Sequence, residues 1–237
     1  MFTVWRSGLP HRLLTTAPLP SQCHVCHAWP AAPVCEACVN RFAQPINRCL
    51  TCAAPLPMAG QRCGACLKDP PPLDQCLAAV AYAYPWSALI QSYKFHAQTG
   101  LVRSFALLLR ATPWVEDALE AAYLLLPMPL SANRLKERGY NQALLLAQHL
   151  APGKSRADVL LKIVDTPAQH TLKRAQRLVA LNHAFAVEPL RAGELAGKSV
   201  VLVDDVMTTG ASLFSAARVL KSAGARRVTG LVFARTE

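Results

Sequence analysis

The sequence predicts an α/β protein in which a parallel sheet flanked by helices follows a small cysteine-rich module. Three observations support this prediction. Four C-x-x-C pairs lie close together near the start of the chain, a proline-rich stretch (68–75) follows them, and apolar strand-like segments then alternate with helical patterns. Apolar strands separated by helices are typical of a parallel sheet covered on both faces. We therefore expect two parts, 1–75 and 76–237.

The first part has little capacity to build a core of its own. Between Leu19 and Pro72 no helical or alternating apolar pattern is long enough for one, and twelve of the 18 prolines precede Trp86. A segment of this kind needs a metal ion to fold. The stretch "KDPPPLDQ" then forms a stiff, extended connector to the second part.

The second part alternates strands and helices in chain order. Helices are recognised by their apolar periodicity and their ends: Pro113 follows one, Asn141 is placed as the N-cap of another, and Gly224 follows the last. The expected strands span 76–84, 121–130, 158–164, 183–187, 198–206 and 226–234, and the expected helices span 87–95, 99–111, 141–151 and 211–224.

Composition and charge exclude several classes of protein. With 52% hydrophobic and 16% charged residues, the 237-residue chain is too apolar to be disordered. It has no apolar run long enough to span a membrane and no apolar signal-peptide core near its start, so we expect a cytoplasmic protein. The formal net charge of +11 is spread along the chain and favours polyanionic partners, such as phosphate esters or nucleic acid.

The paired cysteines indicate structural zinc. In the reducing cytoplasm, C-x-x-C pairs bind metal more often than they form disulfides, and each pair presents two thiolates to one ion. Eight ligands suit two Zn²⁺ ions with no position left for a substrate. The pairs can combine in sequence order, or the first can join the third and the second the fourth. The candidate ligands are Cys23, Cys26, Cys35, Cys38, Cys49, Cys52, Cys63 and Cys66.

A second motif, "SVVLVDDVMTTGAS", indicates a ligand site. Asp204 and Asp205 end a buried strand, which is where ligands bind in open α/β sheets, and two carboxylates without partners are costly to bury there. The turn from Thr208 to Ser212 then opens a helix whose free N–H groups favour a phosphate. Carboxylates that accept from sugar hydroxyls, beside such a turn, suit a ribose 5-phosphate. The alternative is an aspartate that only caps the helix.

This motif resembles the phosphoribosyl pyrophosphate (PRPP) binding motif of type I phosphoribosyltransferases. The resemblance implies that Asp204 and Asp205 hold the ribose 2′- and 3′-hydroxyls and that Mg²⁺ bridges the ribose and the pyrophosphate. It also implies that the following loop wraps the 5-phosphate. That loop consists of Met207, Thr208, Thr209, Gly210, Ala211 and Ser212.

Nearly the whole chain is similar to the ComF-type competence and DNA-utilisation proteins. The cysteine pairs, "YKF" (93–95), "PMPL", "RGYNQ" (138–142) and "TPAQHTLKRAQR" (166–177) contribute to this resemblance. It implies a type I phosphoribosyltransferase-like fold behind a double zinc ribbon, and a link to DNA uptake or the use of external DNA.

The same resemblance places two basic segments around the pyrophosphate. Arg134, Lys136 and Arg138 would face it from a loop ahead of Asn141, and arginine forks suit phosphate oxygens. The segment 166–177 corresponds to a mobile hood that closes over PRPP. Its candidate residues are Lys173, Arg174 and Arg177. The family pattern Arg-x-x-Asn is broken there, because Ala180 stands where the asparagine is expected.

Two further functions compete with that of an active phosphoribosyltransferase. One is a protein that binds single-stranded DNA and keeps the transferase fold for binding alone, although aromatic residues are not interleaved with basic ones in the sequence. The other is a zinc-stabilised docking protein for DNA-uptake partners. No residue pattern names an acceptor substrate, a catalytic side chain or an oligomeric state.

Overall fold

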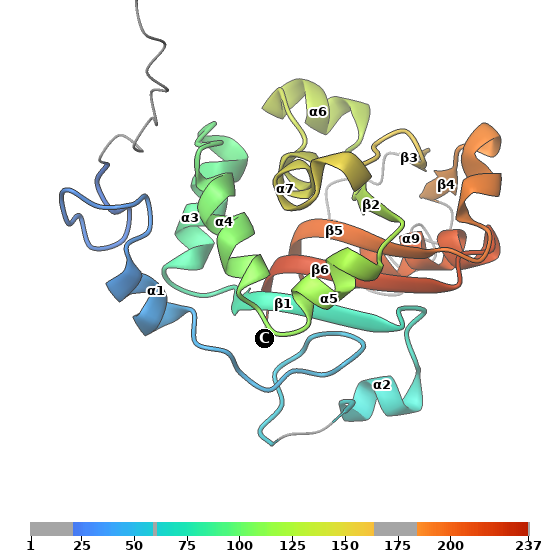
Figure 1. Ribbon diagram of the computed structural model, residues 1–237, viewed down its shortest axis with the longest axis horizontal. Helices are drawn as coiled ribbons and strands as arrows, with labels where there is room; N and C mark the ends of the chain where they lie inside the picture. The colour runs from blue at the N-terminus through green and yellow to red at the C-terminus, as the bar shows by residue number, and fades with distance from the viewer. Residues whose placement is uncertain (1–20, 59–60, 164–183, 237) are drawn as a thin grey trace, which may run out of the picture.

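A four-stranded parallel sheet forms the centre of the protein (Figure 1). The computed structural model describes residues 21–58, 61–163 and 184–236. The strand order is β1 (Gln75–Ala81), β6 (Arg227–Arg235), β5 (Ser199–Met207) and β2 (Leu124–Pro127). All three neighbouring pairs are parallel, which confirms the predicted α/β architecture.

Helices cover both faces of this sheet. One face packs against α3 (Trp86–Phe95), α4 (Leu101–Arg110), α5 (Val115–Ala121) and α7 (Gln142–Leu150), around Phe105 and Phe233, whose rings stack with centroids 4.0 Å apart. The other face packs mainly against α9 (Ala211–Ser222), which buries Leu213, Ala216, Ala217 and Leu220. Each helix buries one apolar stripe, as the helical periodicity predicts.

Strands β5 and β2 lie side by side but continue to opposite faces of the sheet. The chain leaves β5 for α9 on one face, and it leaves β2 through α6 (Ala132–Arg138) to α7 on the other. Such a change of direction opens a crevice at the carboxyl ends of the two strands, where open α/β sheets bind their ligands. The fold therefore places a candidate site at the end of β5.

The cysteine-rich segment, drawn from blue to cyan in Figure 1, runs along the β1 side of the sheet. It contains α1 (Glu36–Phe42) and α2 (Gly64–Lys68). The Trp86 indole N–H donates to the carbonyl of Phe42 at 2.7 Å, and the Cys76 N–H donates to the carbonyl of Leu50 at 2.7 Å. The segment is thus tied both to α3 and to the start of β1.

Besides α1 and α2 of the cysteine-rich segment, the short helices α5 and α6 are absent from the sequence-based prediction. Helix α6 occupies the stretch that was expected to be a basic loop; it begins at Ser131, whose hydroxyl accepts from the Arg134 N–H, and ends at Gly139 with φ 77°. Helix α5 follows Trp114, and its first turn contains Glu116 and Asp117. An N-cap serine, a C-terminal glycine and acidic residues in a first turn are ordinary helix signals, so these errors were avoidable.

Six strands were predicted, and four of them form the central sheet. Segments β3 (Leu160–Lys162) and β4 (Phe185–Val187) pair with each other in antiparallel fashion, as a separate two-stranded sheet. Two 3₁₀ helices, Pro152–Lys154 and Pro189–Leu195, complete the elements of the described residues. In that part of the chain no helix has both the length and the apolar character needed to cross a membrane.

Candidate functional site

The two adjacent carboxylates lie where β5 extends past the end of β2. The last residue of β2, Pro127, pairs with Val203, so Asp204 and Asp205 follow the final pair on that side. On the other side, Asp204 still pairs with Val232 of β6. The carboxylates therefore stand at the carboxyl edge of the sheet, beyond the last pair of β5 with β2.

Asp205 is not without a partner, contrary to the expectation from sequence. Its side chain is buried, and its Oδ2 lies 2.9 Å from the Nζ of Lys94 in the last turn of α3. Lys94 is itself half-buried. The ammonium balances one of the two adjacent negative charges, which explains how a buried strand can end in this pair.

Asp204 is in a different environment from its neighbour. It is half-buried, and its Oδ1 accepts the Asp205 backbone N–H at 2.9 Å. Burial first, and then the charge of Asp205, raise the pKa of Asp204 to about 8, although Lys94 acts in the opposite direction. Because the ionised form of this carboxyl group is unfavourable, a ligand that donates hydrogen bonds to it would stabilise that form.

The loop after β5 requires a glycine. Gly210 is the N-cap of α9 and has φ 81°, in the left-handed region that disfavours other residues. A Cβ atom there would lie 2.3 Å from Cε of Met207 and 2.7 Å from the ring of Phe214. Gly210 therefore brings the chain tightly into α9, whose first N–H groups lack partners within the helix and attract an anion.

The remaining residues of the loop differ in what they can offer a ligand. Thr208 and Thr209 are exposed, and the Thr209 hydroxyl accepts the Ala211 N–H at 3.4 Å. Ala211 and Ser212 are half-buried in the first turn of α9. The Met207 side chain is buried against the sulfur of Cys76, so only its backbone can face a ligand.

The predicted pyrophosphate residues lie on or next to α6. Arg134 and Arg138 are half-buried, and Lys136 is exposed. The Arg138 guanidinium lies 4.9 Å from the ring centroid of Phe95, the residue after Lys94. Of these three cations, Arg138 is therefore the one that the structure joins to the end of α3, beside the ion pair of Asp205.

Tyrosines hold the α6–α7 connection against α3. The Tyr140 hydroxyl donates to the backbone carbonyl of Tyr93, and the buried Tyr93 hydroxyl donates to the carbonyl of Gln142 at 2.9 Å. Asn141 caps α7 as predicted, since its Oδ1 accepts the Leu144 N–H. The sequence motifs 93–95 and 138–142 are thus parts of one contact.

The hood candidates Lys173, Arg174 and Arg177 lie outside the described residues, because the structure describes nothing between 164 and 183.

The eight paired cysteines form two clusters, grouped in sequence order. One contains Cys23, Cys26, Cys35 and Cys38, and the other contains Cys49, Cys52, Cys63 and Cys66; within each, the sulfur atoms lie within 4.8 Å of one another. The sulfurs of Cys23 and Cys38 are 3.9 Å apart, and those of Cys52 and Cys63 are 3.7 Å apart. A tetrahedron with Zn–S bonds of about 2.3 Å has edges of about 3.8 Å, so both clusters fit a zinc ion.

Backbone donors in both clusters stabilise thiolates. The Cys35 N–H donates to the sulfur of Cys23 at 3.4 Å, and the Cys63 N–H donates in the same way to Cys49 at 3.3 Å. Burial alone raises the pKa of these two thiols, but the backbone N–H groups outweigh it and lower each pKa to about 6. Thiolates are the form that binds metal.

The second cluster shares its core with the loop after β5. Cys49, Cys52 and Cys66 are buried together with Met207 and Leu213. Arg235, at the end of β6, donates from Nε to the carbonyl of Cys52 at 2.9 Å and from Nη1 to the carbonyl of Met207 at 3.4 Å. The first cluster packs instead with the helices on the opposite face of the sheet.

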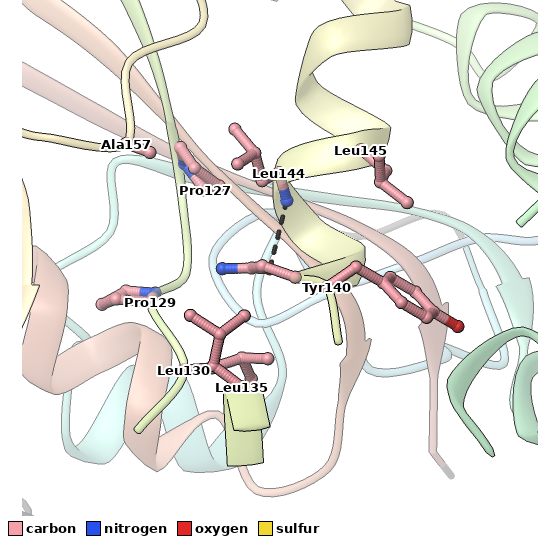
Figure 2. Close-up of a pocket in the computed structure, with 9 residues that line it drawn as sticks. Pro127, Pro129, Leu130, Leu135, Tyr140, Leu144, Leu145 and Ala157 are labelled. Carbon is pink, nitrogen blue, oxygen red and sulfur yellow. Dashed lines mark hydrogen bonds between the residues drawn. The ribbon is translucent and has the colours of Figure 1, made fainter. Parts of the chain in front are cut away.

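A separate apolar pocket of about 360 Å³ lies between the end of β2, α6 and α7. Figure 2 shows Leu144 and Leu145 projecting from α7, while the ring of Tyr140 points away from the prolines that follow β2. The side-chain amide of Asn141, which also lines it, is used by the Met128 carbonyl and the Leu144 N–H. No residue from 204 to 212 lines this pocket, and its lining suits neither phosphate nor ribose.

Lys94 is the site residue that the sequence-based reasoning missed. Its motif was noted as part of a resemblance, but no role was given to it. The role becomes visible only in the contact between α3 and β5, where Lys94 meets Asp205. These two residues are 111 positions apart in the sequence. A lysine in the last turn of a helix with no other charged residue was the available signal.

Comparisons with known proteins agree with this geometry. Residues 137–236 match the family model described as "Phosphoribosyl transferase domain". "Competence protein F" of Haemophilus influenzae is 32% identical over 203 residues, which cover 82% of this chain and 87% of that protein. "DNA utilization protein YhgH" of Salmonella typhimurium is 30% identical over 86% of this chain and 90% of its own length. "Competence protein ComFC" of Bacillus subtilis is 34% identical over 43% of this chain and 40% of its own.

Proposed function

Because the chain belongs to the ComF family of competence and DNA-utilisation proteins, we propose that it binds PRPP with Mg²⁺ at the carboxyl end of β5. One observation above all supports this proposal. A half-buried carboxylate, Asp204, is followed within six residues by Gly210 and the N-terminus of α9, at the crevice between β5 and β2. A ribose 5-phosphate presents hydroxyls and a phosphate at about this separation.

Within this proposal the two carboxylates have different roles. Asp204 accepts hydrogen bonds from the ribose hydroxyls, because none of the ion pairs among the described residues uses its carboxyl group. Asp205 is held by Lys94 and fixes the position of the strand end, and it meets the ribose only if that ion pair is exchanged. The 5-phosphate lies at the first turn of α9, with hydroxyl groups from Thr208, Thr209 and Ser212 as further donors.

The pyrophosphate lies toward α6 and the end of α3. Lys94 and Arg138 supply positive charge on that side, and Arg134 and Lys136 extend it along α6. Mg²⁺ bound to the phosphates would neutralise part of their charge. In a transfer reaction the bond from C1 of the ribose to pyrophosphate breaks and C1 bonds to the acceptor atom, which releases its proton. The cations stabilise the departing pyrophosphate, while the hood candidates close the site.

We also propose that each cysteine cluster holds one structural Zn²⁺. Four thiolates close the coordination sphere, so the ions stabilise the fold and take no part in chemistry. All nine cysteines of the described residues are free thiols, which suits a reducing cytoplasm. The names of the relatives, which mention competence and DNA utilisation, further support a role linked to DNA. For that role we propose single-stranded DNA and DNA-uptake proteins as partners.

Isothermal titration calorimetry tests the proposal. At pH 8.5, above the pKa of Asp204, the wild-type chain should bind PRPP in the presence of Mg²⁺. Asp204→Asn should weaken binding at least about tenfold, since hydrogen bonds to a charged acceptor contribute about 1.5–3 kcal/mol. Glu116→Gln, which removes a carboxylate from the distant helix α5, is the matched control and should bind as the wild type does. If the wild-type chain binds no PRPP, the proposal is wrong.

A further inference from the structure

The amino ends of the strands, opposite the candidate PRPP site, present a row of cations beside an aromatic ring. We call this group the amino-edge row; it consists of Tyr123, Lys198, Arg226 and Arg227. Lys198, Arg226 and Arg227 are exposed, and Tyr123 is 48% exposed. Each residue stands immediately before a strand of the central sheet or at its first position.

The backbone fixes the order of this row across three strands. The N–H groups of Arg226 and Arg227 donate to the Lys198 carbonyl at 2.8 and 3.4 Å, and the Tyr123 N–H donates to the Ser199 carbonyl at 2.8 Å. Neighbouring strands lie about 4.8 Å apart, so the row runs about 10 Å from β6 across β5 to β2. The strand backbones therefore fix these four positions as one strip along the sheet edge, without a flexible loop.

The cations of the row are available to a ligand. None of the ion pairs found among the described residues involves Lys198, Arg226 or Arg227. The neighbouring Asp74 accepts the Val228 N–H and pairs with Lys221 at 2.7 Å, so it does not neutralise them. The Arg227 guanidinium donates to the neutral Gln75 side chain, at 3.0 Å.

The ring of Tyr123 belongs to the same strip. The Nζ of Lys198 lies 4.9 Å from its centroid, which places a cation against an exposed aromatic face. Cations that track a phosphate backbone, together with an aromatic side chain on which a base can stack, are the combination found in proteins that bind single-stranded nucleic acid. A duplex offers the same phosphates but keeps its bases stacked, so the ring would add nothing to its binding.

We propose that the amino-edge row binds single-stranded nucleic acid. Lys198, Arg226 and Arg227 contact phosphates, and Tyr123 stacks on a base. Ser199 and Asp205 are six strand positions apart, about 20 Å along β5, so the strip is separate from the PRPP site. One chain can hold both ligands at once. This inference rests on the proposed link to DNA and not on PRPP binding.

Fluorescence anisotropy with a labelled 20-nucleotide thymidine oligomer, measured over a salt series, tests the proposal on the full chain. The double variant Arg226→Ala/Arg227→Ala should bind at least about tenfold more weakly at low salt. Each lost phosphate contact lowers the slope of log affinity against log salt by about 0.7, so the slope should fall by about 1.4. The charge-matched control Lys68→Ala/Arg103→Ala removes two exposed cations elsewhere and should keep the wild-type slope.

Tyr123 variants test the single-strand specificity. Tyr123→Phe keeps the stacking surface and should bind within about threefold of the wild type, whereas Tyr123→Ala should lose about tenfold or more for the oligomer and little for a duplex. Equal losses in the Arg226→Ala/Arg227→Ala variant and in its control would overturn the proposal, as would a Tyr123→Ala variant with unchanged binding. Thermal unfolding of each variant, and PRPP calorimetry, identify any loss caused by misfolding.

Discussion

Lys94 and Asp205 form an ion pair, with 2.9 Å between Nζ and Oδ2, that joins the end of α3 to the end of β5. The pair is largely shielded from water, because the side chains of Lys94 and Asp205 are 19% and 6% exposed. It balances the charge of one of two adjacent carboxyl groups and leaves the other, Asp204, without an ion pair among those of the described residues. The electrostatics of the candidate PRPP site therefore depend on a residue outside its sequence motif.

Removal of Lys94 should destabilise the fold by leaving a buried charge without a partner. We expect Lys94→Met to lower the free energy of unfolding by about 3 kcal/mol, and the double variant Lys94→Met/Asp205→Asn to recover much of that loss. Lys221→Met breaks the more exposed pair with Asp74 and should cost no more than about 1 kcal/mol. Urea unfolding of the four chains measures these values, and equal losses for Lys94→Met and Lys221→Met would contradict the account.

The raised pKa of Asp204 predicts how stability depends on pH. Its pKa is about 8 in the folded chain, against an ordinary value of 3.8, because burial and Asp205 oppose its charge. Between these values the folded chain holds a proton that the unfolded chain has released, so stability falls as the pH rises from about 4 to about 8. An asparagine does not ionise, so Asp204→Asn should lose less stability than the wild type over that pH range.

Urea unfolding at pH 5.5, 7.0 and 8.5 measures this difference. The comparison of Asp204→Asn with the wild type cancels the contributions to stability that the two chains share. The free energy of unfolding of Asp204→Asn, relative to that of the wild type, should increase as the pH rises. Parallel stability curves would show that the Asp204 pKa is not raised.

Gly210→Ala should damage both the fold and the ligand site. The left-handed backbone costs an alanine about 1–2 kcal/mol, and the contacts of its Cβ with Met207 and Phe214 add a packing cost of similar size. Gly193→Ala is the control, since nothing lies within 4 Å of a Cβ there and its φ is not positive. Thermal unfolding and PRPP calorimetry should show a loss for Gly210→Ala alone.

The two cysteine clusters should differ in their effect on PRPP binding. Cys35 and Cys63 are the third cysteines of their clusters and are both half-buried, so Cys35→Ser and Cys63→Ser form a matched pair. Each should reduce bound zinc, measured by elemental analysis, from about two ions to about one. Only Cys63→Ser should weaken PRPP binding, by about tenfold, because Arg235 connects the second cluster to the Met207 carbonyl. Equal effects of the two variants on PRPP affinity would contradict this connection.

Local patterns were sufficient to predict most elements of the central sheet and the eight clustered cysteines, although they left open which pairs share a cluster. The run from Ser199 to Met207 is apolar because β5 is buried between two strands and under helices on both faces, and the C-x-x-C spacing is a property of a single turn. Asn141 and Gly224 marked helix ends correctly because capping depends on a few neighbouring residues.

Features that depend on tertiary contacts were not predictable in this way. Strands β3 and β4 have strand-like sequences, but nothing local shows that they pair with each other outside the parallel sheet. Nor does the sequence show that Lys94 meets Asp205, or that Tyr123 and Lys198 lie together at the amino edge. The aromatic and basic residues of that edge are separated along the chain and become neighbours only through strand order.

A crystal structure of the chain with Mg²⁺ and PRPP tests the central claim most directly. The account predicts the 5-phosphate against the backbone N–H groups of the first turn of α9, the ribose hydroxyls at Asp204, and the pyrophosphate on the side of Lys94 and Arg138. PRPP bound elsewhere, or with its pyrophosphate at the N-terminus of α9, would contradict it.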